Sequence, residues 1–151
     1  NNCPFCAKSA DEAFLTSKNF LAIYNIAPVL PGHSLVIPKR HVESVFDLTE
    51  EETGELMQLA RKVAMLLGEE LDTDAFDWAV QEKEEAGQSI PHVHMHVVPR
   101  KIGDLPKPGD WYQELEKSEV HIESTHRKKL NPEEMKVIVD RLRKAGEKLA
   151  Q

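Results

Sequence analysis

The stretch EAGQSIPHVHMHVVPR, residues 85–100, places three histidines at alternate positions of a short apolar run. His92, His94 and His96 are each separated by a single valine or methionine. Strict alternation of polar and apolar residues is typical of a β-strand, whose side chains point in turn to opposite faces. We therefore predict a strand that carries all three imidazoles on one face and buries the intervening apolar side chains.

Alternating histidines on a strand suit two kinds of chemistry. The imidazoles could converge on a metal ion, or one could act as nucleophile or general base while the others donate hydrogen bonds. Just upstream, Gly87 permits a close backbone approach, and Gln88, Ser89 and Gln81 offer uncharged donors to phosphate oxygens. The neighbouring acidic residues are predicted to lie in a solvated loop, so the pattern favours phosphate chemistry.

Length and charge exclude several classes of protein. The chain has 151 residues, a formal net charge of −7 and no basic run, which argues against an extended nucleic-acid surface. We find no apolar run near the roughly 20 residues that a membrane span needs, and no pattern of a signal peptide. We therefore expect one domain that is cytoplasmic, with no membrane and no nucleic-acid partner.

Periodicity predicts an α+β domain: an antiparallel meander sheet crossed by one long helix, plus a C-terminal helix. Thr49 and Glu52 form a capping box for the long helix, which we expect to end at Gly68. The other predicted elements are a hairpin at 13–25, strands at 33–39, 75–81 and 120–124, and a helix capped by Asn131 with Pro132 and Glu134.

The only two cysteines, Cys3 and Cys6, are spaced C-x-x-C. In a cytoplasmic protein this spacing suggests a metal knuckle or a redox pair more readily than a structural disulfide. Two reduced thiols near the N-terminus are an equally simple interpretation.

Two segments together resemble a known family. HVHMHVV, residues 92–98, fits the His-φ-His-φ-His-φ-φ pattern of the histidine triad superfamily, where φ is hydrophobic. The longer EAGQSIPHVHMHVVPRKIGD is similar to its fragile-histidine-triad (Fhit) branch, and YNIAPVLPGHSLVIPKRHVESVFDLTEEE, residues 24–52, resembles the upstream part of the family. The resemblance implies a histidine triad domain over 1–115. The tail has no counterpart in the family, and we expect residues 116–151 to form an extension that packs on the same domain.

The resemblance also implies roles for individual residues. His94 would attack the α-phosphorus of a nucleotide and form a covalent nucleotidyl-histidine, which water then hydrolyses. His96 and His33 correspond to positions that contact phosphate. Gln81 matches the glutamine near the bridging oxygen and leaving group, and Asn25 lines the nucleoside side of the pocket. On this basis His94, His96 and Gln81 are the expected catalytic residues. The expected substrate-binding residues are Asn25, His33, Gln88, Ser89 and His92.

The cysteine pair departs from the Fhit branch and resembles other members, including galactose-1-phosphate uridylyltransferases. In those proteins a structural zinc is held by two such cysteines and two histidines, which here would be Cys3, Cys6, His41 and His92. A set of two cysteines and two histidines is closed and tetrahedral, suited to fastening a segment and not to catalysis. A divalent cation bound together with the substrate is a further expected cofactor.

The resulting hypothesis is a homodimeric hydrolase of dinucleoside polyphosphates that acts on a small-molecule nucleotide. The alternatives are a Hint-type nucleoside phosphoramidase, a nucleotidyl transferase, a non-catalytic nucleotide-binding sensor, and a catalytic metal site on the three histidines. Trp111 and Tyr112 have three open interpretations: stacking on a base, packing at a dimer interface, or burial in the core.

Overall fold

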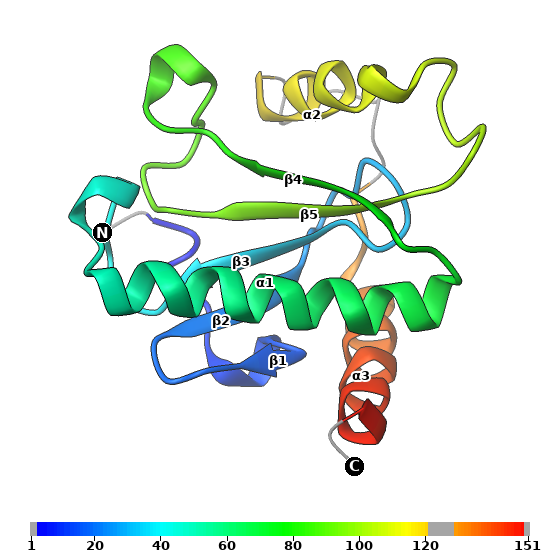
Figure 1. Cartoon of the computed structure of the whole chain (residues 1–151), viewed down its shortest axis with the longest axis horizontal. Helices are drawn as coiled ribbons and strands as arrows, with labels where there is room; N and C mark the ends of the chain where they lie inside the picture. Colours follow the sequence, from blue (N-terminus) through cyan, green and yellow to red (C-terminus); the bar gives the residue numbers. More distant parts are fainter. Residues whose placement is uncertain (1–2, 121–128, 150–151) are drawn as a thin grey trace.

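A five-stranded antiparallel sheet with strand order β1-β2-β3-β5-β4 forms the centre of the computed structural model, which describes residues 3–120 and 129–149 (Figure 1). The strands are β1 Leu15–Thr16, β2 Phe20–Tyr24, β3 Ser34–Pro38, β4 Ala75–Val80 and β5 Met95–Arg100. The helices are α1 Glu50–Leu71, α2 Trp111–Val120 and α3 Pro132–Leu149, with short helical turns η1 Ala10–Glu12, η2 Val45–Asp47, η3 Glu84–Ala86 and η4 Pro108–Asp110.

The predicted α+β class, antiparallel sheet, long crossing helix and C-terminal helix are all confirmed. The first three strands follow one another as a meander, whereas β5 lies between β3 and β4. This order arises because α1 carries the chain from β3 across the sheet to its far edge, and the next strand then fills the space left between them.

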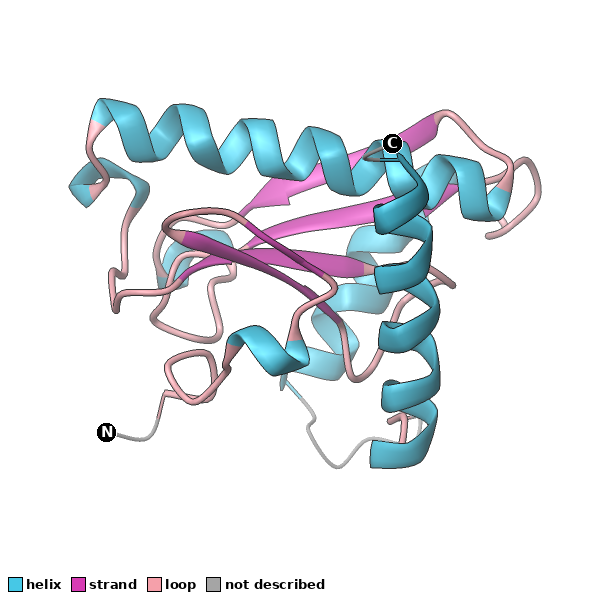
Figure 2. Ribbon diagram, turned by 90° about the horizontal axis from the view of Figure 1, so that it is seen from below, coloured by secondary structure: helices cyan, strands magenta, loops and turns pink. Residues whose placement is uncertain are grey.

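The two faces of the sheet have different partners (Figure 2). Alternate strand residues such as Phe20, Val36 and Val97 join the large core beneath α1 and α3. The residues between them on β2 and β3 face a smaller cluster built around Phe5 of the N-terminal segment. The side of the sheet away from α1 is therefore the side on which the N-terminal segment packs.

Helix α1 begins as predicted and ends later. The Thr49 hydroxyl accepts from the Glu52 backbone at 3.0 Å, and the Glu52 carboxylate accepts from the Thr49 backbone at 2.9 Å. The predicted end at Gly68 is wrong, because the helix continues to Leu71 and is capped by Asp72 at φ 55°. A Cβ at Gly68 would lie 2.5 Å from the Thr73 carbonyl oxygen, so this glycine permits the chain to fold back on the helix.

The capping box predicted at the start of the C-terminal helix is confirmed in α3. Asn131 and Glu134 exchange side-chain and backbone hydrogen bonds at 2.8 and 3.1 Å. The apolar face of α3, including Val139 and Leu142, packs into the core against α1. In the predicted strand at 120–124, Val120 ends α2 instead, and the remaining positions lie outside the described residues. No helix in the described ranges combines the length and apolar character needed to cross a membrane.

Candidate functional site

The histidine run divides at the start of a strand. Strand β5 begins at Met95, so the prediction that His92 and His94 also belong to the strand is wrong. The backbone between His92 and His94 bonds to a loop and not to a strand, because the Val93 amide donates to the Val42 carbonyl at 2.7 Å. His96 is paired with Leu35 of β3, on the face of the sheet away from α1.

His94 has the protonation pattern of a nucleophile. Its side chain is only 3% exposed, and Nδ1 lies 2.8 Å from the carbonyl oxygen of His92. Because a carbonyl oxygen can only accept, Nδ1 carries the proton and Nε2 keeps its lone pair. Burial lowers the pKa of His94 from its ordinary value of 6.5, despite the opposing effect of that hydrogen bond. The imidazole is therefore neutral at neutral pH.

His33 fixes the tautomer of His96, which is the opposite of the tautomer of His94. The Val29 amide donates to His33 Nδ1 at 3.1 Å, so the proton of a neutral His33 is on Nε2. That nitrogen lies 3.0 Å from His96 Nδ1 and donates to it. A neutral His96 must then carry its own proton on Nε2. This arrangement turns His96 Nε2 into a donor, as stabilisation of phosphate oxygens requires.

Asn25 lies beside this relay with a fixed amide orientation. Its Oδ1 accepts from the Ala27 backbone at 2.9 Å, which directs Nδ2 toward His33 Nε2 at 3.3 Å. Since Nδ2 cannot accept a hydrogen bond, the proton of His33 Nε2 has to go to His96. The residue predicted to line the nucleoside side of the pocket is thus next to the two predicted phosphate contacts.

Three predicted polar residues line one cavity of about 590 Å³ at the end of β4. Continuing the pairing of Val80 with Met95 by one residue places Gln81 across from His94. Gln81 Oε1 is buried without a hydrogen-bond partner. Ser89 is exposed, whereas the amide of Gln88 accepts from Lys83 N at 2.8 Å and donates to Glu43 O at 3.0 Å. The amide oxygen and nitrogen of Gln88, which were expected to contact phosphate, therefore bond to the backbone and hold the loop in place.

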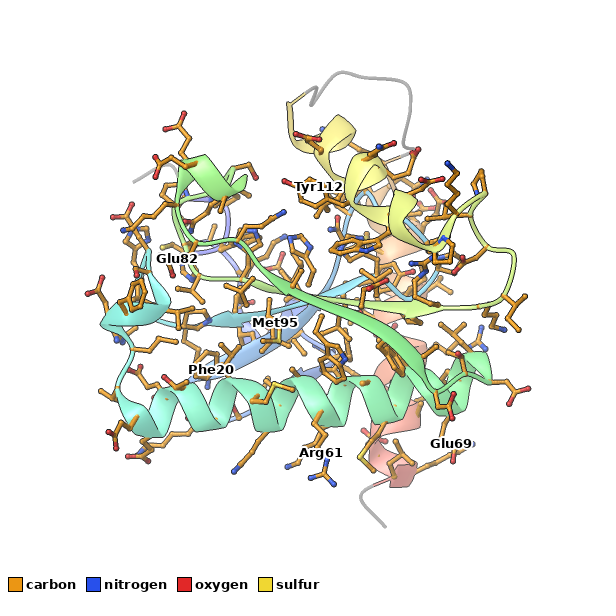
Figure 3. The ribbon with its side chains drawn as sticks, turned by 45° about the horizontal axis from the view of Figure 1, so that its top comes forward. Phe20, Arg61, Glu69, Glu82, Met95 and Tyr112 are labelled. Atoms are coloured by element: carbon orange, nitrogen blue, oxygen red, sulfur yellow. The ribbon has the colours of Figure 1, made fainter. Side chains whose placement is uncertain are left out.

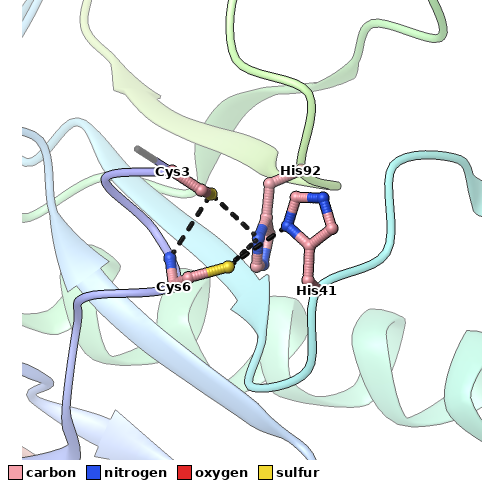
Figure 4. A group of neighbouring side chains, drawn as sticks. All are labelled: Cys3, Cys6, His41 and His92. Atoms are coloured by element: carbon pink, nitrogen blue, oxygen red, sulfur yellow. Dashed lines mark hydrogen bonds between the residues drawn. The ribbon is translucent and has the colours of Figure 1, made fainter. Parts of the chain in front are cut away.

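The four predicted metal ligands are brought together from three separate segments (Figure 4). One ligand atom from each of Cys3, Cys6, His41 and His92 can be chosen so that all lie within 4.8 Å of one another. His92 Nδ1 is 3.4 Å from Cys3 Sγ and 3.5 Å from Cys6 Sγ, and His41 Nδ1 is 3.1 Å from Cys6 Sγ.

The two distances from His92 match the spacing of ligands around a tetrahedral zinc ion, and the distance of 3.1 Å from His41 to Cys6 is slightly shorter. Zinc bonds of about 2.0 to 2.3 Å place neighbouring ligand atoms roughly 3.3 to 3.8 Å apart. The tautomer also fits, since His92 Nε2 donates to the Pro38 carbonyl at 2.9 Å and leaves Nδ1 unprotonated toward the sulfurs. Burial is the main cause that lowers the pKa of His92, which keeps this nitrogen available as a ligand.

Phe5 connects the two parts of the histidine run and was missed by the sequence analysis. Its ring centroid lies 5.7 Å from that of His92 and 5.0 Å from that of His94, and the side chain is buried. The position of Phe5 inside the C-P-F-C knuckle was the available signal, because a knuckle that binds a metal must hold the intervening residues close to it.

A buried neutral histidine with its Nε2 lone pair lies directly before strand β5 of the antiparallel sheet, beside a second histidine that is oriented as a donor, and this arrangement suits nucleophilic chemistry by histidine. Comparison with known proteins gives the family. The model of the HIT domain matches residues 7–103. The chain therefore belongs to the HIT domain family.

Characterised relatives and a solved structure resemble the chain over most of its length. It is 42% identical to bis(5'-adenosyl)-triphosphatase of Dictyostelium discoideum over 70% of this chain and 71% of the relative. It is 38% identical to the asymmetrical bis(5'-nucleosyl)-tetraphosphatase of Schizosaccharomyces pombe over 76% of this chain, but this covers only 63% of that relative. A zinc-bound histidine triad family protein from Mycobacterium smegmatis shares 27% identity and a TM-score of 0.72, over 99% of this chain and 96% of that one.

Proposed function

We propose that the protein hydrolyses dinucleoside polyphosphates and releases a nucleoside monophosphate through a covalent intermediate on His94. The single observation that carries this proposal is the buried, neutral His94 with its proton fixed on Nδ1. The names of relatives 38 to 42% identical, a triphosphatase and a tetraphosphatase of dinucleotides, support the choice of substrate class.

The proposed reaction has two steps. His94 Nε2 attacks the α-phosphorus, a P–N bond forms, and the bond from phosphorus to the bridging oxygen breaks with its electron pair leaving on the second nucleotide. Water then attacks the same phosphorus and loses a proton, and the electron pair of the P–N bond returns to Nε2. The His92 carbonyl, at 2.8 Å from His94 Nδ1, stabilises the cationic imidazole of the intermediate.

His96 and Gln81 are proposed to act on the oxygens around that phosphorus. His96 Nε2 donates to a non-bridging oxygen, where negative charge is concentrated in phosphoryl transfer. Gln81, which follows the pairing of Val80 with Met95 at the same end of the strands as His94, would face the leaving group. Asn25, His33, Ser89 and the backbone near Gly87 would shape the pocket around the nucleotide, while Gln88 holds the loop in place.

We further propose that Cys3, Cys6, His41 and His92 hold a structural zinc, which would supply a closed crosslink between the N-terminal segment and the sheet. The M. smegmatis neighbour, whose name describes it as zinc-bound, supports this assignment. A divalent cation accompanying the substrate, a histidine triad domain over 1–115 with an extension over 116–151, and a cytoplasmic location without a nucleic-acid partner remain proposals of the same kind.

A homodimer is proposed on the basis of apolar exposure on one side of the molecule. Met57 and Met65 on α1 and Trp78 on the edge strand β4 are 47%, 57% and 40% exposed. Such side chains near an open strand edge suit association with a second copy. Light scattering at several concentrations measures the assembly directly.

The reaction can be tested by isotope labelling. The protein is incubated with diadenosine triphosphate in ¹⁸O-water, and AMP and ADP are separated and weighed by mass spectrometry. Attack at the α-phosphorus puts the label in AMP and leaves ADP unlabelled. Label in ADP instead would show attack at the central phosphorus and contradict the proposal.

The covalent step needs its own measurement, since direct attack by water gives the same labelling. An alkaline quench during turnover, followed by peptide mapping, should find an adenylyl group on His94. Adenosine phosphoramidate is run in parallel. If it is turned over and the dinucleotides are not, the activity is that of a phosphoramidase.

A further inference from the structure

One side of the cavity at the end of β4 contains none of the proposed catalytic residues. Its roughly 590 Å³ are enclosed between the loop of residues 81–91 and helix α2, which contributes Tyr112 and Glu116. Figure 3 shows Tyr112 on α2, on the side of the molecule where the loop after β4, marked by Glu82, also lies. A volume of this size is within the usual range of about 300 to 1,000 Å³ for small-molecule sites.

Tyr112 reaches down to the floor of this cavity because of a glycine. Gly87 has a φ of +94°, and a Cβ built there would lie 3.1 Å from Tyr112 Oη and 3.6 Å from Gln81 Nε2. The tyrosine hydroxyl, the glycine backbone and the Gln81 amide therefore meet at one point. Tyr112 is 39% exposed, so its ring is partly open to a ligand.

The charges in the cavity indicate which part of a substrate fits. Glu43, Glu84 and Glu116 contribute three carboxylates to the lining, against the single ammonium of Lys83. This balance disfavours a phosphate group, whereas an uncharged nucleoside offers hydroxyl and amino donors that carboxylates accept. An aromatic ring adds a stacking surface that suits any base.

The cavity also lies on the correct side of the nucleophile. Gln81 is part of the cavity lining, and it directly follows Val80, whose partner Met95 directly follows His94. A leaving group that departs from His94 past Gln81 therefore enters the space beneath Tyr112.

We propose that this cavity is the subsite for the nucleoside of the leaving nucleotide, and that Tyr112 stacks on its base and determines the preference for a dinucleotide. The inference rests on the proposed hydrolase function and adds the place of the second nucleoside. It predicts that Tyr112 contributes only when the leaving group carries a base.

Two substrates separate this role from general damage. Diadenosine triphosphate has a nucleotide leaving group, whereas adenosine phosphoramidate releases only ammonia and cannot reach Tyr112. For Tyr112→Ala we expect kcat/KM with diadenosine triphosphate to fall about 5- to 50-fold, mainly through KM, as loss of one base stack implies. With adenosine phosphoramidate it should stay within about twofold of the wild type. Tyr112→Phe, which keeps the ring, should retain most of the activity on both substrates.

Phe46→Ala is the matched control, because Phe46 is 86% exposed and does not line this cavity. It should leave both substrates unaffected. Equal losses on both substrates in Tyr112→Ala, or no loss on either, would overturn the subsite. If the wild type cleaves adenosine phosphoramidate but no dinucleotide, the proposed hydrolase function fails and the subsite with it.

Discussion

Two histidines separated by one residue have opposite assignments, and the difference lies in their backbone partners. His92 donates from Nε2 to the Pro38 carbonyl, which directs the Nδ1 lone pair at Cys3 and Cys6. His94 donates from Nδ1 to the His92 carbonyl, which leaves the lone pair of Nε2 available for the proposed nucleophilic attack. We call these the metal side and the chemistry side of the run. The comparison teaches that the accepting carbonyl, and not the residue type, selects the role of each imidazole.

The largest expected effect is the loss of activity when His94, on the chemistry side, is replaced. Replacing His94 with alanine removes the only proposed nucleophile, so AMP release from diadenosine triphosphate should fall by a factor on the order of 10³ or more. The thermal midpoint should also fall, because the side chain is buried and its removal leaves a cavity, but it should fall less than in a variant that loses the metal. Product chromatography and thermal melting measure both quantities.

His92→Ala is the matched comparison and should show a major loss of stability together with loss of bound metal. If both variants lose activity and stability to the same extent, the two histidines do not have separate roles.

The second prediction concerns stability on the metal side. Cys6→Ser should lose the zinc and lower the thermal midpoint by roughly 10 °C, because the crosslink between the N-terminal segment and the sheet is broken. Metal analysis by mass spectrometry and melting in the presence of a chelator test this. His94→Ala serves as the control that should keep its zinc. A wild-type protein that stays metal-free after refolding with excess zinc would refute the site.

A smaller effect is expected from the relay on the chemistry side. His33→Ala removes the donor to His96 Nδ1, so His96 is no longer confined to the tautomer with its proton on Nε2. We expect kcat to fall about 10- to 100-fold with little change in KM, as for loss of one transition-state donor. His33→Gln retains an amide donor and should recover part of the rate.

Nitrogen NMR of His96 provides a readout that does not depend on turnover. In the wild type it should report one tautomer, and in His33→Ala a mixture. An unchanged tautomer in the alanine variant would mean that His33 does not orient His96.

The smallest predicted effect concerns the segment that carries His41. Arg40 forms a bidentate ion pair with Glu52 of α1 at 2.9 Å, and this contact is the main cause that lowers the pKa of Glu52 from 4.5 to about 2. A lowered carboxyl pKa stabilises the fold above pH 4.5, and this stabilisation is lost as the pH falls from 4.5 toward 2.

Glu52→Gln should therefore destabilise the protein by about 1 kcal/mol at pH 7, and the difference from the wild type should vanish near pH 2. Urea unfolding over this pH range measures it. Glu51→Gln, at the preceding and exposed position of α1, is the matched control. A difference that stays constant down to pH 2 would exclude the ionised carboxylate as its cause.

Much of the fold could be predicted because it depends on local patterns. The capping boxes at Thr49 and Asn131 involve residues three positions apart, and the hairpin strands alternate in hydrophobicity. The end of α1 could not be predicted, since the requirement for Gly68 comes from the Thr73 carbonyl after the chain has turned. A glycine that ends a helix and one that permits close packing look the same in sequence.

The candidate site was predictable as a set of residues and less so as a geometry. The Cys and His positions brought together by the structure were named from the family resemblance. The start of β5 at Met95 was not, because it depends on the bond from Val93 to Val42, far away in sequence. The relay through Val29 and His33 was also missed, since a backbone amide leaves no trace in a side-chain pattern.

The segment after the cysteine pair depends on Arg143 of α3 for two of its hydrogen bonds. Its guanidinium donates to the carbonyls of Ala13 at 2.8 Å and Ala10 at 3.0 Å, across about 130 positions of the chain. During synthesis the ribosome makes residues 10–13 about 130 positions before Arg143, so these carbonyls cannot receive the guanidinium until Arg143 has emerged. A nascent chain paused before Arg143 should therefore leave this segment without two of its native contacts and open to chaperones or proteases.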